Sequence, residues 1–119
     1  MEWALHVNGV QEVEGIQTGP LDPVQVESRK VIEEAFGRIA FSRVYFGNEF
    51  CQHLIPTLAH LRAVYLAAVE KGFTFTLLTP YITDDGLEKL KPLLSFLSTR
   101  EDLIEVVVND WGVFNFLRR

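Results

Sequence analysis

The sequence predicts an α/β fold built on a parallel sheet, and three observations lead to that class. After residue 40, short apolar segments alternate with amphipathic segments of helical period. Such alternation is typical of βαβ units, in which right-handed crossovers join parallel strands. The length of 119 residues suits one domain, and a hydrophobic fraction of 48% provides for a core. We therefore expect a single α/β domain over residues 1–119. When compact, it should expose roughly 6,500 Å² of surface.

The N-terminal residues predict a β-hairpin. Residues 2–7 place alternate side chains on two faces, and this period of two indicates a strand. Asn8 and Gly9 form the dipeptide best suited to a type I′ turn. Residues 10–16 are then expected to return as a second strand.

A helix is expected to complete the region 1–40. Asp22 is a suitable N-cap, and Pro23 occupies the first helical position, where its missing N–H costs nothing. Apolar residues recur at helical spacing over 24–36, and Gly37 suits the C-terminal end of the helix.

Residues 41–119 predict a βαβαβ unit followed by a short helix. β-branched and aromatic residues mark the strands, and apolar seams at helical spacing mark the helices. The expected elements are a strand over 41–46, a helix over 56–71, a strand over 73–79, a helix after Thr83, a strand over 104–108 and a helix over 113–117.

Composition and charge exclude several classes of protein. The net charge of −5 argues against a nucleic-acid surface. No apolar run is long enough to cross a bilayer, and residues 1–6 lack the basic and apolar stretches of a secretory signal. The single cysteine, Cys51, allows no intrachain disulfide, which favours a reducing compartment. We therefore expect a cytoplasmic protein without nucleic-acid or membrane partners.

Candidate functional residues lie where the predicted strands end. Parallel α/β folds gather functional groups at the carboxyl ends of their strands. Here these ends are the polar and aromatic junctions 47–51, 79–81 and 109–112. Ordinary loops have the same composition, so the pattern also fits junctions without a function. The candidate site face comprises Gly47, Asn48, Glu49, Asn109 and Asp110.

Each reaction considered for these junctions has a plainer alternative. Cys51 is a candidate nucleophile if His53 or His60 activates its thiol, although a lone cysteine usually packs as a small hydrophobic residue. Glu49 and Asp110 form either an acid–base pair or two solvated or cap-forming carboxylates. The sequence contains no glycine-rich phosphate loop, nucleophile elbow or paired-cysteine zinc motif.

Two short motifs carry a resemblance to a known family. Residues 44–47 read Val-Tyr-Phe-Gly, and Cys51 follows four residues later. Residues 106–113 read VVVNDWGV, one βα unit further along the chain. Together the motifs resemble the first and third strands of the collagenase-like peptidase family (peptidase U thirty-two), over about residues 40–117. The pattern is most similar to the members that hydroxylate ubiquinone without oxygen and hold a four-iron–four-sulfur cluster.

The resemblance implies a TIM barrel of parallel strands, of which this chain holds about three, with Cys51 as one possible iron–sulfur ligand. A complete (β/α)₈ barrel needs roughly 250 residues, and the family's other cluster cysteines lie farther along the chain. We therefore expect a partial barrel, either an N-terminal fragment of a longer protein or a small relative. The chain alone should hold no cofactor and hydrolyse no peptide, and a four-iron–four-sulfur cluster belongs to a longer parent protein.

Two other functions stay open. In a partial barrel the outermost strand has unpaired backbone groups, so residues 104–108 predict self-association through an exposed strand edge. The chain would then be a non-catalytic interaction module. The third hypothesis is a small stand-alone α/β enzyme with Cys51 as its nucleophile.

Overall fold

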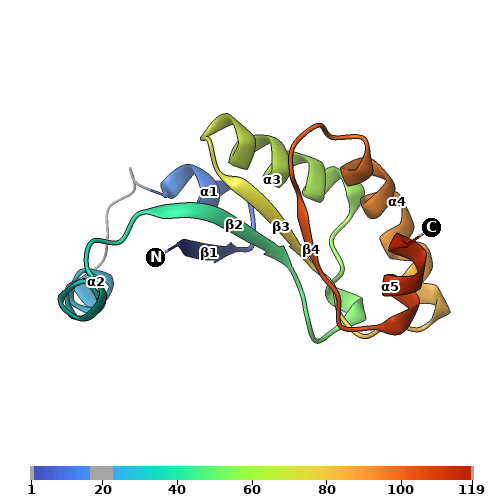
Figure 1. Ribbon diagram of the computed structural model, residues 1–119, viewed down its shortest axis with the longest axis horizontal. Coiled ribbons are helices and arrows are strands. Elements are labelled where there is room, and N and C mark those ends of the chain that lie inside the picture. Colours follow the sequence, from blue (N-terminus) through green and yellow to red (C-terminus); the bar gives the residue numbers. More distant parts are fainter. Residues whose placement is uncertain (1, 17–22, 119) are drawn as a thin grey trace.

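The computed structural model describes residues 2–16 and 23–118, which form four strands and five α-helices (Figure 1). This confirms the α/β class. The elements are β1 (Trp3–Val7), α1 (Val10–Gly15), α2 (Pro23–Phe36), β2 (Phe41–Gly47), the 3₁₀ turn η1 (Gln52–Leu54), α3 (Leu58–Glu70), β3 (Thr74–Leu78), α4 (Asp84–Ser98), β4 (Glu105–Val107) and α5 (Trp111–Leu117).

The strands form one sheet in the order β1-β2-β3-β4, and every neighbouring pair is parallel. Each crossover steps to the next strand in the same direction, so right-handed crossovers place their helices on the same face. Figure 1 shows α1, α3 and α4 along the sheet, whereas α2 stands apart at one end of the molecule. The parallel strands predicted after residue 40 are confirmed.

The helix-covered face of the sheet holds the core. Side chains alternate between the two faces of a strand, and paired residues of parallel strands share a face. Val44 pairs with Phe75, and Phe46 pairs with Leu77, so these four side chains lie together beneath the helices. The buried core comprises Val7, Val13, Ile16, Val44, Phe46, Leu61, Val64, Tyr65, Ala68, Phe73, Phe75, Leu77, Leu90, Leu93, Leu94, Leu97 and Val113.

The predicted N-terminal hairpin is wrong. β1 pairs in parallel with β2, and residues 10–15 form α1 instead of a return strand. Gly9 is extended, with φ of −173°, and lacks the positive φ of a type I′ turn. Glu12 accepts hydrogen bonds from the backbone N–H and the side-chain amide of Asn8, at 3.1 and 3.4 Å. This contact ties the first turn of α1 to Asn8, two residues before the helix begins. Val13 of the same helix is buried in the core.

Side-chain caps set the starts of two helices. Thr57 accepts a hydrogen bond from the backbone N–H of His60 at 3.2 Å, so α3 begins slightly later than predicted. Asp110 accepts one from Gly112 at 2.6 Å, so α5 begins slightly earlier. The predicted cap Asp22 lies outside the described residues.

Candidate functional site

The carboxyl ends of β2, β3 and β4 meet at one rim of the sheet, where hydrogen bonds join their loops. The side-chain oxygen of Gln52, after β2, accepts from the backbone N–H and the hydroxyl of Thr83, at 2.9 and 3.1 Å. Asn109 Nδ2, after β4, donates to the Thr79 carbonyl oxygen at 3.0 Å. The three junctions chosen from the sequence therefore lie next to one another.

Two of the predicted site residues hold loop backbone in place. Both carboxylate oxygens of Asp110 are engaged, because Oδ1 accepts from Gly112 at 2.6 Å and Oδ2 accepts from Ile82 at 3.2 Å. The side-chain oxygen of Asn48 accepts from the backbone N–H groups of residues 50 and 51, at 2.8 and 2.6 Å. These contacts match the cap and Asx-turn roles of such residues.

Gly47 serves the backbone geometry of the rim. Its φ of +115° lies in the region that side-chain-bearing residues rarely adopt. A Cβ at this position would also clash with the Leu78 carbonyl oxygen on the neighbouring strand. Glycine lets β2 end against β3 and turn into the loop that carries the remaining candidates.

Two of the predicted site residues, Glu49 and Cys51, differ from Asn48 and Asp110 in how their side chains are engaged. Both residues are half-buried, and among residues 2–16 and 23–118 neither their carboxylate nor their thiol has a hydrogen-bond partner. His60 packs its ring edge-on against Phe46, with ring centres 5.0 Å apart. Within the described part of the chain, no histidine nitrogen hydrogen-bonds to the Cys51 sulfur, so the geometry contains no Cys–His pair.

The rim does not by itself make a metal site. Among the described residues, no group of three or more histidine, cysteine or acidic side chains could hold a metal ion. A four-iron–four-sulfur cluster takes four cysteine ligands, and Cys51 is the only cysteine in the sequence. The residues present therefore do not fit a cluster without ligands from elsewhere.

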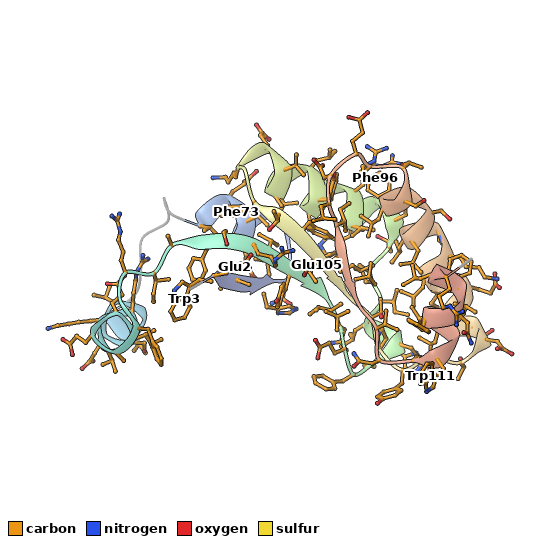
Figure 2. All side chains as sticks on the ribbon, viewed as in Figure 1. Glu2, Trp3, Phe73, Phe96, Glu105 and Trp111 are labelled. Atoms are coloured by element: carbon orange, nitrogen blue, oxygen red, sulfur yellow. The ribbon has the colours of Figure 1, made fainter. Side chains whose placement is uncertain are left out.

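A charged network on the other face of the sheet was missed by the sequence analysis. Arg43 on β2 forms ion pairs with Glu2 at 3.1 Å and with Glu105 of β4 at 3.4 Å. Figure 2 labels the two glutamates. Arg43 Nη1 also donates to the hydroxyl of Thr76 at 2.9 Å. The Arg43 side chain is only 12% exposed, and Figure 1 shows α1, α3 and α4 along the opposite face of the sheet. The available signal was the period-two placement of Thr74 and Thr76 in β3, which marks a polar face.

Comparison of the chain with protein-family models, with curated proteins and with solved structures yields no significant match. Over the described residues, no helix has the length and apolar character required to cross a membrane.

Proposed function

We propose that the chain is a barrel-forming segment of a peptidase-like or iron–sulfur (β/α) barrel protein, and that it has no activity on its own. The observation that supports this most is the strand order β1-β2-β3-β4. In a (β/α) barrel each strand lies beside the next strand in the chain, and the crossover helices lie outside. In doubly wound folds the order reverses at a switch point, and helices cover both faces.

The uncovered polar face favours the same proposal. An open parallel sheet is normally covered on both faces, whereas the inner face of a barrel is filled by side chains of its own strands. The face that carries Arg43 and Thr76 would be this inner face. Barrel closure would bury the network and provide partners for β1 and β4, the two edge strands of the described sheet.

The exposed surface of the chain is larger than a compact domain requires. Its accessible area is 7912 Å², compared with roughly 6,500 Å² for a compact chain of this length. Its radius of gyration is 15.7 Å, compared with about 13.5 Å. On α2, Val24, Val31 and Phe36 are 72%, 61% and 60% exposed. Apolar exposure of this kind is typical of surfaces that further protein covers.

The proposal gives Glu49 and Cys51 distinct roles. Glu49 would supply a carboxylate for acid–base chemistry at the mouth of the barrel. Cys51 would supply one cluster ligand, as the resemblance to the iron–sulfur members suggests, with three more cysteines from outside residues 1–119. A cytoplasmic location is part of this proposal, because a lone cysteine suits a reducing compartment.

Hydrogen exchange tests the barrel. Backbone amides of Glu105–Val107 should exchange faster than those of the central strand β3 in the 119-residue chain, because β4 has one strand neighbour. In a longer gene product that contains this chain, the β4 amides should become as protected as those of β3. Unchanged exchange of β4 in the longer product would contradict barrel closure.

Anaerobic reconstitution with iron and sulfide tests the cluster. In the longer product, Cys51→Ser should reduce the cluster absorbance and the bound iron. His53→Ala, two residues away in η1, is the matched control and should change neither. A cluster that is indifferent to Cys51→Ser, or no cluster at all, would contradict the role of Cys51.

A non-catalytic interaction module is the second candidate function. It is favoured because both edge strands of the described sheet, β1 and β4, have free outer sides. Sedimentation equilibrium should then show a mass that rises from monomer to dimer with concentration. A single monomeric species at high concentration would rule out self-association.

A further inference from the structure

Helix α2 lies outside the core of the described fold. Among the residues that the structure describes, no member of the buried core comes from α2, and the helix stands apart at one end of the molecule (Figure 1). Phe36 packs edge-on against Trp3, with ring centres 6.3 Å apart, and Arg29 Nη2 donates to the Ile39 carbonyl oxygen at 2.8 Å. These contacts attach α2 to the sheet and to the following loop, but they leave most of its surface exposed.

A helix of this length and composition is marginal without packing. α2 has 14 residues, and isolated helices of about 12–15 residues or fewer are only marginally stable in water. It contains three valines and an isoleucine, which have lower helix propensities than alanine or leucine. Most of the stability of helices in proteins comes from packing an apolar face. The helix α2 therefore needs a surface that covers it.

One face of α2 has the spacing of a coiled-coil seam. Four exposed residues follow one another at intervals of four, three and four positions: Val24, Ser28, Val31 and Ala35. We call these four residues the α2 seam. Ile32 and Phe36 widen the apolar stripe on one side of the seam, whereas Val26 lies nearly opposite.

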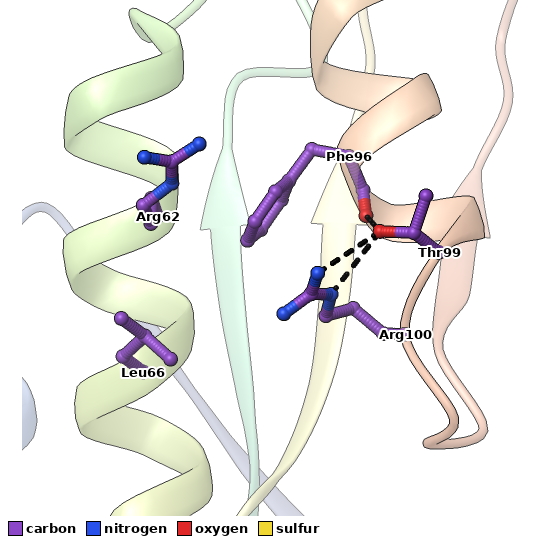
Figure 3. A pocket seen from close by; sticks show the side chains of 5 residues that line it. All are labelled: Arg62, Leu66, Phe96, Thr99 and Arg100. Carbon is purple, nitrogen blue, oxygen red and sulfur yellow. Dashed lines mark hydrogen bonds between the residues drawn. The ribbon is translucent and has the colours of Figure 1, made fainter.

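The α2 seam contains no charged side chain. The charged residues of this helix lie on its other faces, where Arg29 and Glu33 pair at 3.1 Å. The outer side of α3 differs, because its exposed Leu66 lines a hollow beside Arg62, and the Arg62 guanidinium stacks on Phe96 of α4 (Figure 3). A protein surface that packs on the α2 seam therefore desolvates no ionised group of the seam.

We propose that the α2 seam of a second copy covers this seam, so that two chains form a symmetric dimer through their α2 helices. A seam of this spacing packs against the same spacing on another helix, and a two-fold axis supplies it from a second copy. The accessible area of the chain, 7912 Å², exceeds that of a compact chain by roughly 1,400 Å². This excess is larger than the roughly 800 Å² that each partner contributes to a standard interface.

The proposed dimer does not depend on the proposed barrel. α2 precedes β2, so it lies at the end of the sheet opposite to the rim (Figure 1). The α2 seam contains no rim residue and no residue of an edge strand. Failure of the barrel and failure of the α2 dimer can therefore be told apart.

Sedimentation equilibrium of the 119-residue chain tests the dimer. The mass should rise from monomer to dimer with concentration, and the helix content measured by circular dichroism should rise with it, because packing stabilises α2. Val31→Glu should raise the dissociation constant at least about 100-fold, because each dimer would bury two unpaired carboxylates. Val26→Glu is the matched control and should leave the dissociation constant unchanged. Val26 is 51% exposed, compared with 61% for Val31, but it lies on the opposite face of the helix.

A second pair of variants tests for tighter association. Ser28→Leu adds an apolar side chain to the α2 seam and should lower the dissociation constant about tenfold. Lys30→Leu adds the same side chain off the seam and should leave the dissociation constant unchanged. Equal effects of these two variants would contradict the assignment of the seam.

Three results would overturn the α2 dimer. The first is a mass that stays monomeric at every concentration. The second is a dimer that Val31→Glu leaves intact, as association through the edges of β1 or β4 would. The third is a longer gene product that stays monomeric while the amides of α2 are protected from exchange, because residues outside this chain would then cover the helix.

Discussion

Gly47 fixes the end of β2 through its positive φ and its close approach to Leu78. Gly47→Ala should lower the free energy of unfolding by at least about 2 kcal/mol, because backbone strain and a backbone clash add. Gly72→Ala is the matched control: its φ is +82°, but nothing lies within 4 Å of an added Cβ, so only about 1 kcal/mol is expected. Urea unfolding followed by circular dichroism measures both, and equal losses would contradict the clash.

The Tyr65 hydroxyl donates a hydrogen bond to the Asp102 carboxylate. Burial, followed by this hydrogen bond and the charge of Asp102, raises the pKa of Tyr65 to about 12. The folded-state pKa lies above the unfolded value of about 10, so the folded state holds the proton more tightly. Its stabilising contribution is complete below about pH 10 and is lost as pH rises through the folded-state pKa.

The free energy of unfolding should therefore fall between about pH 10 and 12, by at most about 1.4 kcal/mol per pH unit from this group. Tyr65→Phe should remove this part of the pH dependence. Tyr81→Phe is the control, because Tyr81 is exposed and its removal should leave the profile as in the wild type. Urea unfolding across this pH range tests the difference, and identical profiles for both variants would contradict it.

Among the elements, the sheet depends on Arg43 to connect Glu2, Thr76 and Glu105 across its uncovered face. Arg43→Met should lower the free energy of unfolding by about 2 kcal/mol, because it removes two ion pairs and one of the two hydrogen bonds of the buried Thr76 hydroxyl. Lys91→Met, which removes an exposed ion pair with Glu88, should cost under about 0.5 kcal/mol. Chemical denaturation measures both, and similar losses would mean that Arg43 acts as an ordinary surface charge.

Element type could be predicted from the sequence wherever one period dominates. After residue 40, β-branched and aromatic residues mark the strands and apolar seams at helical spacing mark the helices, and the structure places these elements in the predicted order. The region around Gly9 carried two conflicting signals. The Asn8-Gly9 pair favoured a turn, while Glu12 was placed to bind back to Asn8 and start a helix. The long-range pairing of β1 with β2 decided between them.

For the whole molecule, the free outer sides of β1 and β4, the edge strands of the described sheet, predict that stability depends on concentration. If copies associate through these edges, the folded state is stabilised by mass action. For a dimer, each tenfold increase in concentration should add about 1.4 kcal/mol and raise the thermal midpoint. Scanning calorimetry at several concentrations measures this shift, and a constant midpoint would contradict edge-to-edge association.

The candidate site was predictable in part, because strand ends meet at a rim in any parallel sheet. The sequence predicted that Asn109 and Asp110 lie near the loop after β2. In the structure, both residues form hydrogen bonds with the loop after β3, which lies between the other two. The sequence did not reveal which polar atoms are already engaged, since that depends on loop conformation. The period-two pattern of β3 marks a polar face, but the contacts of Arg43 on that face depend on strand register, which this pattern does not encode.

The two tryptophans lie at opposite ends of the sheet (Figure 2). Trp3 is half-buried and packs edge-on against Phe36 of α2, whereas Trp111 is 78% exposed at the start of α5. The chain thus carries two built-in fluorophores that sense different regions. Acrylamide should quench Trp111 far more than Trp3, and any protein that covers the rim should shift Trp111 emission to the blue. Trp3→Phe and Trp111→Phe separate the two signals, so closure over the rim can be followed in real time without an added dye.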